Sequence, residues 1–373
     1  MRLSSTRSLS SRFRFSLCAG ILTLVSGCAG GTLKSVSGDS RLPKELPKEM
    51  IEKFEVKEVS SMSPSSDPAT APSARPLSNS TAPGDSGSGV GVLKTNRPAV
   101  YPRKPKTSGS KERKPLVTAA VAAFAYPSKR PVADPMWLGE QHVFSITYFG
   151  MAAGELTLDV LPYKELNSRK AYHVRGTAVS SKVFSLFYRL NDTVETFMDY
   201  DGLFSHRFHL LLDESKQTRD SLELNDSEKG ETYYWNRWNH VERGLTETQE
   251  FKPMTPFSQD SLSALMYLRF VPLPDGAVIN IPVMSEGRGW EAVVTVLRRE
   301  VIQTPLGSVR TVVVKPETKY QGVLKKSGDS FLWLTDDDRR FIVRLEAKVK
   351  IGTVVATLKE VKKGTPPDAT HSP

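Results

Sequence analysis

Aromatic residues are confined almost entirely to one part of this 373-residue chain. Of the 32 Phe, Tyr and Trp residues, 28 follow residue 123, and all five Trp are among them. Because large apolar side chains supply the surface that folding buries, only this C-terminal part can form a sizeable core. The preceding residues, 29–134, include 13 Pro and are rich in Ser, Gly and Lys. That composition predicts a disordered linker, in which residues 48–59 could form a transient helix.

Charge is distributed as unevenly as aromatic content. The formal net charge is +10, but the excess lies before residue 135, and the remainder carries nearly equal numbers of acids and bases. A basic nucleic-acid-binding domain is therefore excluded. Residues 94–130 hold ten basic side chains and one acid, Glu112. We interpret this stretch as a soluble spacer, and attraction to anionic envelope polymers or lipid headgroups is the alternative.

The N-terminus has the three parts of a secretory signal. Four Arg within the first 14 residues precede an apolar run, residues 15–25, which is too short to span a bilayer. The tetrad Val25-Ser26-Gly27-Cys28 resembles the lipobox of bacterial lipoproteins, in which cleavage precedes the Cys and its thiol is acylated. We predict a signal peptide at residues 1–28, cleaved before Cys28, and a lipid anchor with palmitate-type chains on Cys28. An ordinary signal peptide with an incidental Cys is the alternative.

Cysteine usage and location follow from that anchor. The other cysteine, Cys18, lies within the apolar run, so the mature chain would have neither a disulfide nor a free thiol. Ala29 after the lipidated Cys favours the outer membrane, with the folded domain in the periplasm. The predicted membrane partner is thus reached through Cys28.

From residue 135 onward, short runs alternate apolar and polar side chains, which is typical of strands with one buried face. Turn signals recur every 8 to 14 residues. We predict a mainly β domain over 135–363, a large antiparallel curved sheet that forms a barrel or half-barrel, followed by a flexible tail, 364–373. Two helices are expected, a short one near 181–188 and a stronger one over 258–270, capped by Ser258 or Asp260. The predicted strands are 142–149, 155–161, 171–180, 192–200, 203–212, 219–225, 231–235, 277–284, 290–300, 308–315, 330–335, 340–349 and 353–361.

Four motifs in this domain resemble a bacterial envelope family, domain of unknown function 3108. They are residues 148–154 (YFGMAAG), 191–195 (NDTVE) with 201–203 (DGL), 260–269 (DSLSALMYLR), and 331–340 (FLWLTDDDRR) with 351–352 (IG). Together they span most of residues 138–360. The resemblance implies a β-rich domain in the cell envelope and no known catalytic activity.

The residue patterns do not favour a reaction. His206 and His209 are three apart on a predicted strand, so their side chains point to opposite faces and cannot share a metal. The acids at 336–338 lack the spaced ligands of a calcium loop, and we interpret them as a solvated turn with Arg339 and Arg340 as partners. No nucleophile elbow is present. We therefore predict no catalytic residue, cofactor or metal, and a non-enzymatic protein.

Four side chains are candidate ligand contacts. Arg269 ends the apolar stripe of the stronger helix, where it could receive an anionic headgroup. The alternative is that Arg269 snorkels, completes the helix C-terminus or pairs with an internal acid such as Glu195. The other three candidates are Tyr267, Trp235 and Trp238, although ordinary hairpin packing would also explain the tryptophans.

The leading hypothesis is an envelope lipoprotein that binds or carries an amphipathic lipid ligand in its curved β domain. A scaffold or assembly protein that binds protein or cell-wall glycan through its surface is the competing hypothesis, and an unrecognised hydrolase is the third. A continuous apolar cavity would favour the carrier, and a filled core would favour the scaffold.

Overall fold

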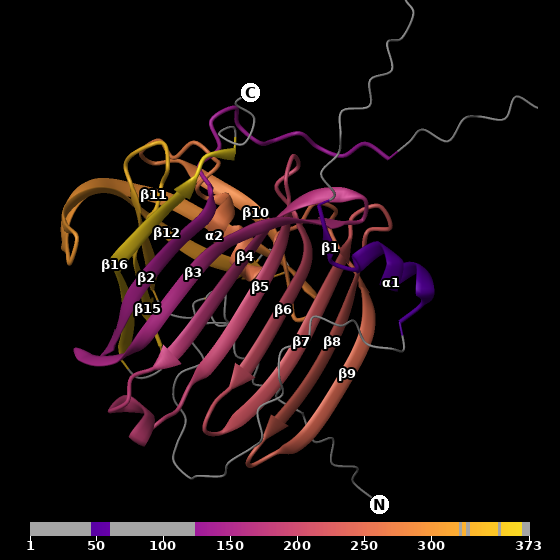
Figure 1. Ribbon diagram of the computed structural model, residues 1–373, viewed down its shortest axis with the longest axis horizontal. Coiled ribbons are helices and arrows are strands. Elements are labelled where there is room, and N and C mark those ends of the chain that lie inside the picture. The colour runs from indigo at the N-terminus through magenta and orange to yellow at the C-terminus, as the bar shows by residue number, and fades with distance from the viewer. Residues whose placement is uncertain (1–45, 60–123, 321–322, 326–328, 350–351, 368–373) are drawn as a thin grey trace, which may run out of the picture. The chain divides into compact units, whose positions relative to one another are not determined.

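The computed structural model describes residues 46–59, 124–320, 323–325, 329–349 and 352–367 (Figure 1). The predicted signal peptide, Cys28 and most of the predicted linker lie outside these residues. A single sheet of 16 strands dominates the described part. The strands are β1 (Lys57–Glu58), β2 (Leu138–Tyr148), β3 (Met151–Leu166), β4 (Arg169–Ser180), β5 (Asn191–Asp199), β6 (Ser205–Asp213), β7 (Gln217–Asp226), β8 (Glu231–His240), β9 (Gly244–Pro253), β10 (Val278–Ser285), β11 (Arg288–Thr304), β12 (Gly307–Tyr320), β13 (Val323–Lys325), β14 (Ser330–Thr335), β15 (Ile342–Lys348) and β16 (Thr353–Thr365).

The sheet is antiparallel and curved, but it does not close. Its main path runs β10-β11-β12-β14-β15-β16-β2-β3-β4-β5-β6-β7-β8-β9, and β1 and β13 pair with β3 and β12 beside that path. Strands β9 and β10 are thus the two edges. The turn between β10 and β11 reaches back to the other half, where the Gly287 backbone N–H donates to Glu223 of β7 at 2.7 Å. The predicted half-barrel is confirmed as an unclosed curved sheet.

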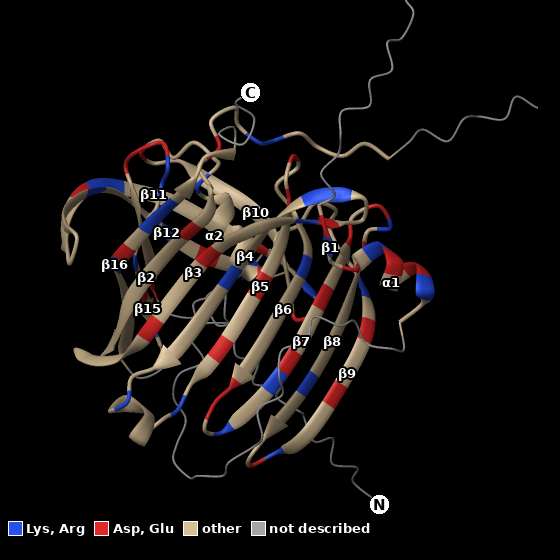
Figure 2. Cartoon of the chain, viewed as in Figure 1, with Lys and Arg blue, Asp and Glu red and all other residues tan. Residues whose placement is uncertain are grey.

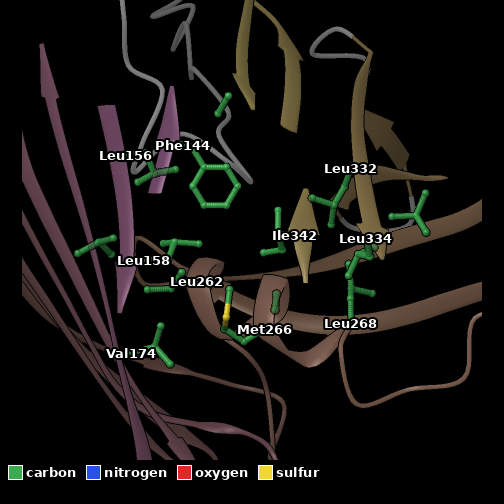
Figure 3. Close-up of a cluster of buried hydrophobic side chains, with 14 of the residues drawn as sticks. Phe144, Leu156, Leu158, Val174, Leu262, Met266, Leu268, Leu332, Leu334 and Ile342 are labelled. Carbon is green, nitrogen blue, oxygen red and sulfur yellow. The ribbon is translucent and has the colours of Figure 1, made fainter. Parts of the chain in front are cut away.

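The core lies on the concave face of this sheet, around one short helix. Helix α2 (Ser261–Tyr267) sits inside the curve in Figure 1 and contacts β5 and β10. Leu262 and Met266 of the helix lie among side chains of β2–β4 on one side and of β14 and β15 on the other, as Figure 3 shows. The helix therefore fills the interior that the curvature creates.

A capping box begins helix α2 at Asp260. The Asp260 carboxylate accepts hydrogen bonds from the backbone N–H groups of Leu262 and Ser263, each at 2.8 Å, and Ser263 Oγ accepts from the Asp260 N–H. The helix is shorter than the expected 258–270, because its C-terminal turn tightens to three-residue hydrogen bonds from Arg269 and Phe270. Asp260 rather than Ser258 is the cap.

Two further elements differ from expectation for identifiable reasons. Strand β9 is not predicted by alternation, because it is an edge strand that is exposed along most of its length. The expected helix at 181–188 is reduced to one 3₁₀ turn, η1 (Phe184–Leu186). Val183, Leu186 and Phe187 are exposed, so they do not form the buried apolar face that would stabilise a longer helix.

The N-terminal boundary also differs. Residues within the expected linker form a packed helix, α1 (Lys48–Phe54), whose Met50 and Phe54 are buried. Residues 124–134, which precede the expected start of the domain, also contact it, because Tyr126 stacks on Phe204 with 5.9 Å between ring centroids. Apolar side chains at helical spacing explain why this part of the segment folds despite its polar surroundings.

Candidate functional site: an apolar rim

Five large hydrophobic side chains are exposed at one end of the half-barrel. They are Phe149, Met151, Val183, Leu186 and Phe187, with exposed fractions between 60% and 81%. We call these five residues the apolar rim. The first two belong to the β2–β3 turn and the others to the segment around η1; both segments lie at the same end of the sheet in Figure 1 and are largely free of charge in Figure 2.

Hydrogen bonds hold the two halves of the rim together. The Ser181 backbone N–H donates to the Ala153 carbonyl at 2.8 Å, and Ser181 Oγ donates to the Ala152 carbonyl at 3.0 Å. Tyr148 and Phe184 meet edge to face, with 6.4 Å between their ring centroids. The turn from β2 and the 3₁₀ segment after β4 therefore form one surface.

The sequence of the β2–β3 turn accounts for the exposure of Phe149. Phe149 and Gly150 both have positive φ, at 50° and 73°, as a two-residue hairpin turn requires. Such a conformation is costly for a Phe, and the turn directs its ring outward. A bulge follows, since Ile146 pairs with Gly154 and Thr147 with Ala152, which leaves Ala153 unpaired.

Beneath the rim lies a small apolar cavity. Its volume is about 30 Å³, roughly the share of one water molecule. The lining side chains include Ile146, Ala153, Leu156, Phe184, Leu190 and Val354. This cavity is too small for an acyl chain, and helix α2 fills the interior beyond it. The contact surface that the structure offers to an apolar ligand is therefore the rim rather than a continuous tunnel.

The rim segment is fastened to the sheet by carboxyl groups. Tyr188 donates a short hydrogen bond to Glu214, and Arg189 forms a bidentate ion pair with Asp213, with both N···O distances 2.8 Å. Asp192 lies beside Glu214, and burial, reinforced by the Glu214 charge, raises the pKa of Asp192 to about 9. A protonated Asp192 can donate to the ionised Glu214, so the pair shares a single negative charge and acts as a latch under the rim.

This carboxyl pair has the chemistry of an acid–base site but not its access. The side chains of Asp192 and Glu214 are only 3% and 2% exposed, and Tyr188 occupies one Glu214 oxygen. Catalysis by paired carboxyls needs a face open to substrate. The position of the pair fits a role in holding the rim segment.

The predicted contact Arg269 is buried and already paired. Arg269 Nη1 lies 2.5 Å from Glu140 Oε1, and Arg339 Nη2 lies 2.5 Å from the other oxygen. Burial alone would raise the pKa of Glu140, but Arg269, with His142 and Arg339, holds it below its usual value. The internal acid is thus Glu140 and not Glu195, which pairs with His173 and Arg175 instead. An anionic headgroup at Arg269 would have to displace Glu140.

The other three predicted contacts lie apart from one another. Tyr267 packs against the interior core. Trp235 lies on the convex face and donates to Glu247 at 3.0 Å, and Trp238 donates to Gln217 at 2.7 Å. The structure does not gather these residues with Arg269 into one site, and none of them belongs to the rim.

The histidines and the acidic turn have local partners. His206 Nε2 lies 2.9 Å from Asp199, and His209 Nε2 lies 2.8 Å from Asp220. Among the described residues, no cluster of three His, Cys, Asp or Glu could hold a metal. Asp337 accepts from the backbone N–H groups of Arg339 and Arg340, as in an Asx turn.

The sequence alone does not predict the apolar rim, although its residues lie in two segments that the sequence patterns single out. Phe149 and Met151 belong to the motif at 148–154, and Val183, Leu186 and Phe187 lie in the segment expected to form a short helix near 181–188. The available signal was the run Val183-Phe184-Ser185-Leu186-Phe187, whose apolar residues leave no polar face for a surface helix.

Family comparison agrees with the motifs. The profile of the family described as "Protein of unknown function (DUF3108)" matches residues 143–359, more than half of the chain. The chain belongs to the DUF3108 family. The resemblance drawn from the four motifs is thereby confirmed. No curated protein matches the sequence of this DUF3108 chain.

Three solved structures are similar to the DUF3108 chain at low identity. A β-barrel-like DUF1849 protein of Brucella abortus has 9% identity and a TM-score of 0.40, covering 61% of this chain and 99% of its own. A candidate exported protein of Bacteroides fragilis with a YmcC-like fold has 13% identity and a TM-score of 0.28, with 64% and 99% covered. A candidate lipoprotein of Parabacteroides distasonis has 10% identity and a TM-score of 0.28, with 64% and 100% covered.

Proposed function

We propose that this DUF3108 protein is a non-enzymatic, lipid-anchored protein of the cell envelope that binds the apolar part of an amphipathic ligand at its apolar rim. The lipobox around Cys28 supports the anchor, and Ala29 supports the outer membrane, with the domain in the periplasm. None of the described helices is long and apolar enough to cross a membrane.

The observation that carries the binding proposal is the exposure of the rim. Folded soluble domains rarely expose several large hydrophobic side chains side by side, and such patches mark interaction sites. The small cavity beneath the rim offers an apolar floor, lined by Ile146 and Leu156 among others. Exposed Lys182 next to Val183 adds a positive charge at the border, which suits an anionic headgroup above an acyl chain.

A filled interior favours a second candidate function. Because α2 occupies the concave space and the cavity beneath the rim is about 30 Å³, that cavity cannot enclose a lipid. A scaffold that binds an apolar segment of another envelope protein would use the same rim. The two functions differ in what co-purifies with the chain: a lipid under the first, and a protein partner under the second.

The test is a binding titration of the purified chain with a fluorescent lysophospholipid. The double substitution Leu186→Ser/Phe187→Ser should weaken binding at least tenfold, roughly 1.4 kcal/mol or more, by removing two apolar contacts. The matched control is Val301→Ser/Leu306→Ser, which removes two exposed hydrophobic side chains from the β11–β12 hairpin. Equal binding by both variants and the unmodified chain would refute the rim as the ligand site.

A further inference from the structure

Residues 46–58, which we call the strap, lie on the convex face of β7 and β8. Met50 and Phe54 are one turn apart on the same face of α1, Leu46 precedes the helix, and each of the three is at most 6% exposed. They pack against the sheet residues Leu222, Leu224 and Tyr233. This face is the convex one because Glu223, between the two leucines, points to the concave side and meets Gly287 there.

Charged groups fasten the helix of the strap at the end of β7. Lys53 Nζ lies 3.0 Å from Asp226 and 2.6 Å from Glu228. Lys229 lies 2.9 Å from Glu49, one turn earlier on the helix. Ion pairs therefore flank the buried apolar side chains, and an apolar centre with a charged border is typical of a specific protein interface.

Backbone contacts extend the attachment beyond the helix. The Asn167 N–H donates to the Lys53 carbonyl at 2.7 Å, and Arg207 Nη1 donates to the Phe54 carbonyl at 3.3 Å. Strand β1 then adds to β3, with Lys57 opposite Glu165 and Glu58 opposite Lys164. The strap is thus bound by apolar packing, by ion pairs and by strand pairing.

The position of the strap in the chain determines which segment separates Cys28 from the folded domain. Residues 60–123 begin at the strap and end at Phe124, so both of their ends are attached to the same domain. Only residues 29–45, about 17 residues, then separate Cys28 from the folded part. Such a tether spans roughly 55–60 Å fully extended and about 20–25 Å on average, whereas a free linker of about 100 residues would average roughly 50–60 Å.

We propose that the strap is the point at which the N-terminal anchor is attached to the domain. The linker 60–123 is then a loop closed on the domain rather than the spacer that joins the domain to its anchor. The membrane part of this inference rests on the proposed lipidation of Cys28. It follows that the domain works close to the anchoring membrane and that a cut in the linker does not free it.

The test uses the full-length chain with a specific protease site inserted within residues 61–123. After cleavage in isolated membranes, the domain should stay in the membrane fraction, because the strap holds it without a covalent link. The variant Met50→Asp/Phe54→Asp should stay membrane-bound while intact and be released by cleavage. The control Lys48→Asp alters an exposed position of the same helix and should behave like the unmodified chain.

Release of the unmodified domain on cleavage would contradict the proposal that the strap attaches the domain to its anchor. If the uncut chain itself were absent from membranes, the lipidation proposal would fail, and the strap would be judged on the purified chain instead. There, the cleaved N-terminal fragment should co-elute with the domain in size-exclusion chromatography at micromolar concentration. Separate elution of the two fragments would refute the proposal independently of any lipid anchor.

Discussion

The Glu140 carboxyl binds two arginines at the end of the half-barrel opposite the apolar rim. It is 2% exposed and accepts from Arg269 and Arg339, which belong to two separate family motifs. Arg339 also lies over the Trp137 ring, with 3.5 Å from its guanidinium carbon to the ring centroid. The ion pair therefore joins the end of α2, the β14–β15 turn and the start of β2.

Replacing that carboxyl should be costly. Glu140→Gln leaves the buried Arg269 and the partly exposed Arg339 without their anion, so the free energy of unfolding should fall by about 3–5 kcal/mol. Glu155→Gln, which removes an exposed partner of Lys359, should change it by about 1 kcal/mol or less. Urea denaturation of the three proteins measures this, and a Glu140→Gln variant as stable as Glu155→Gln would contradict the structural role of the pair.

The latch between Asp192 and Glu214 predicts a pH dependence. The raised pKa of Asp192, about 9, means that the folded chain keeps a proton that the unfolded chain releases above pH 4. The contribution of Asp192 to stability is therefore fully present below about pH 4 and declines as the pH rises toward 9. Asp192→Asn, whose amide can donate to Glu214, should flatten this decline and raise stability at pH 8 by about 1–2 kcal/mol. Thermal unfolding across pH 5–9 that shows parallel curves for both proteins would exclude the latch.

At the scale of elements, the rim depends on a close approach of β3 and β4. A Cβ on Gly154 would lie 2.3 Å from the Val179 carbonyl oxygen, so the strands would have to separate. Gly154→Ala should lower the free energy of unfolding by about 2 kcal/mol or more and disturb the rim. Gly289→Ala in β11, where the nearest atom is 3.8 Å away, should change stability by less than about 1 kcal/mol. Equal denaturation midpoints would contradict this account of the bulge.

Elements were predictable from the sequence where one face of a strand is buried. β16 alternates buried and half-buried residues from Val354 to Lys359, and this alternation predicts the strand correctly. The same rule fails for β9, since both of its faces are largely exposed. The helix expected around η1 does not form, since Val183, Leu186 and Phe187 are exposed and Phe184 packs against the core. The sequence predicts the cap of α2 only as Ser258 or Asp260, and the structure selects Asp260, because the Ser263 hydroxyl completes a capping box with it.

At the scale of the whole molecule, the uneven aromatic content correctly indicated which part folds, but not where it begins. Phe54, an isolated aromatic within a polar segment, is fully buried against β7 and β8. Its partners Leu222 and Tyr233 lie more than 160 positions later in the chain, and no local pattern reveals such a contact. Likewise, the sequence allows an internal acid as the partner of Arg269, but only the sheet topology shows that this acid is Glu140.

The most direct test of the central claim is mass spectrometry of lipids extracted from the purified domain, residues 46–373, after expression in a bacterial periplasm. The account predicts a lipid at near-stoichiometric amounts in the unmodified protein and in Val301→Ser/Leu306→Ser, and its loss from Leu186→Ser/Phe187→Ser. A stable, folded domain that carries no lipid, or one whose lipid content is unchanged by the rim substitutions, would contradict the claim that the apolar rim binds an amphipathic ligand.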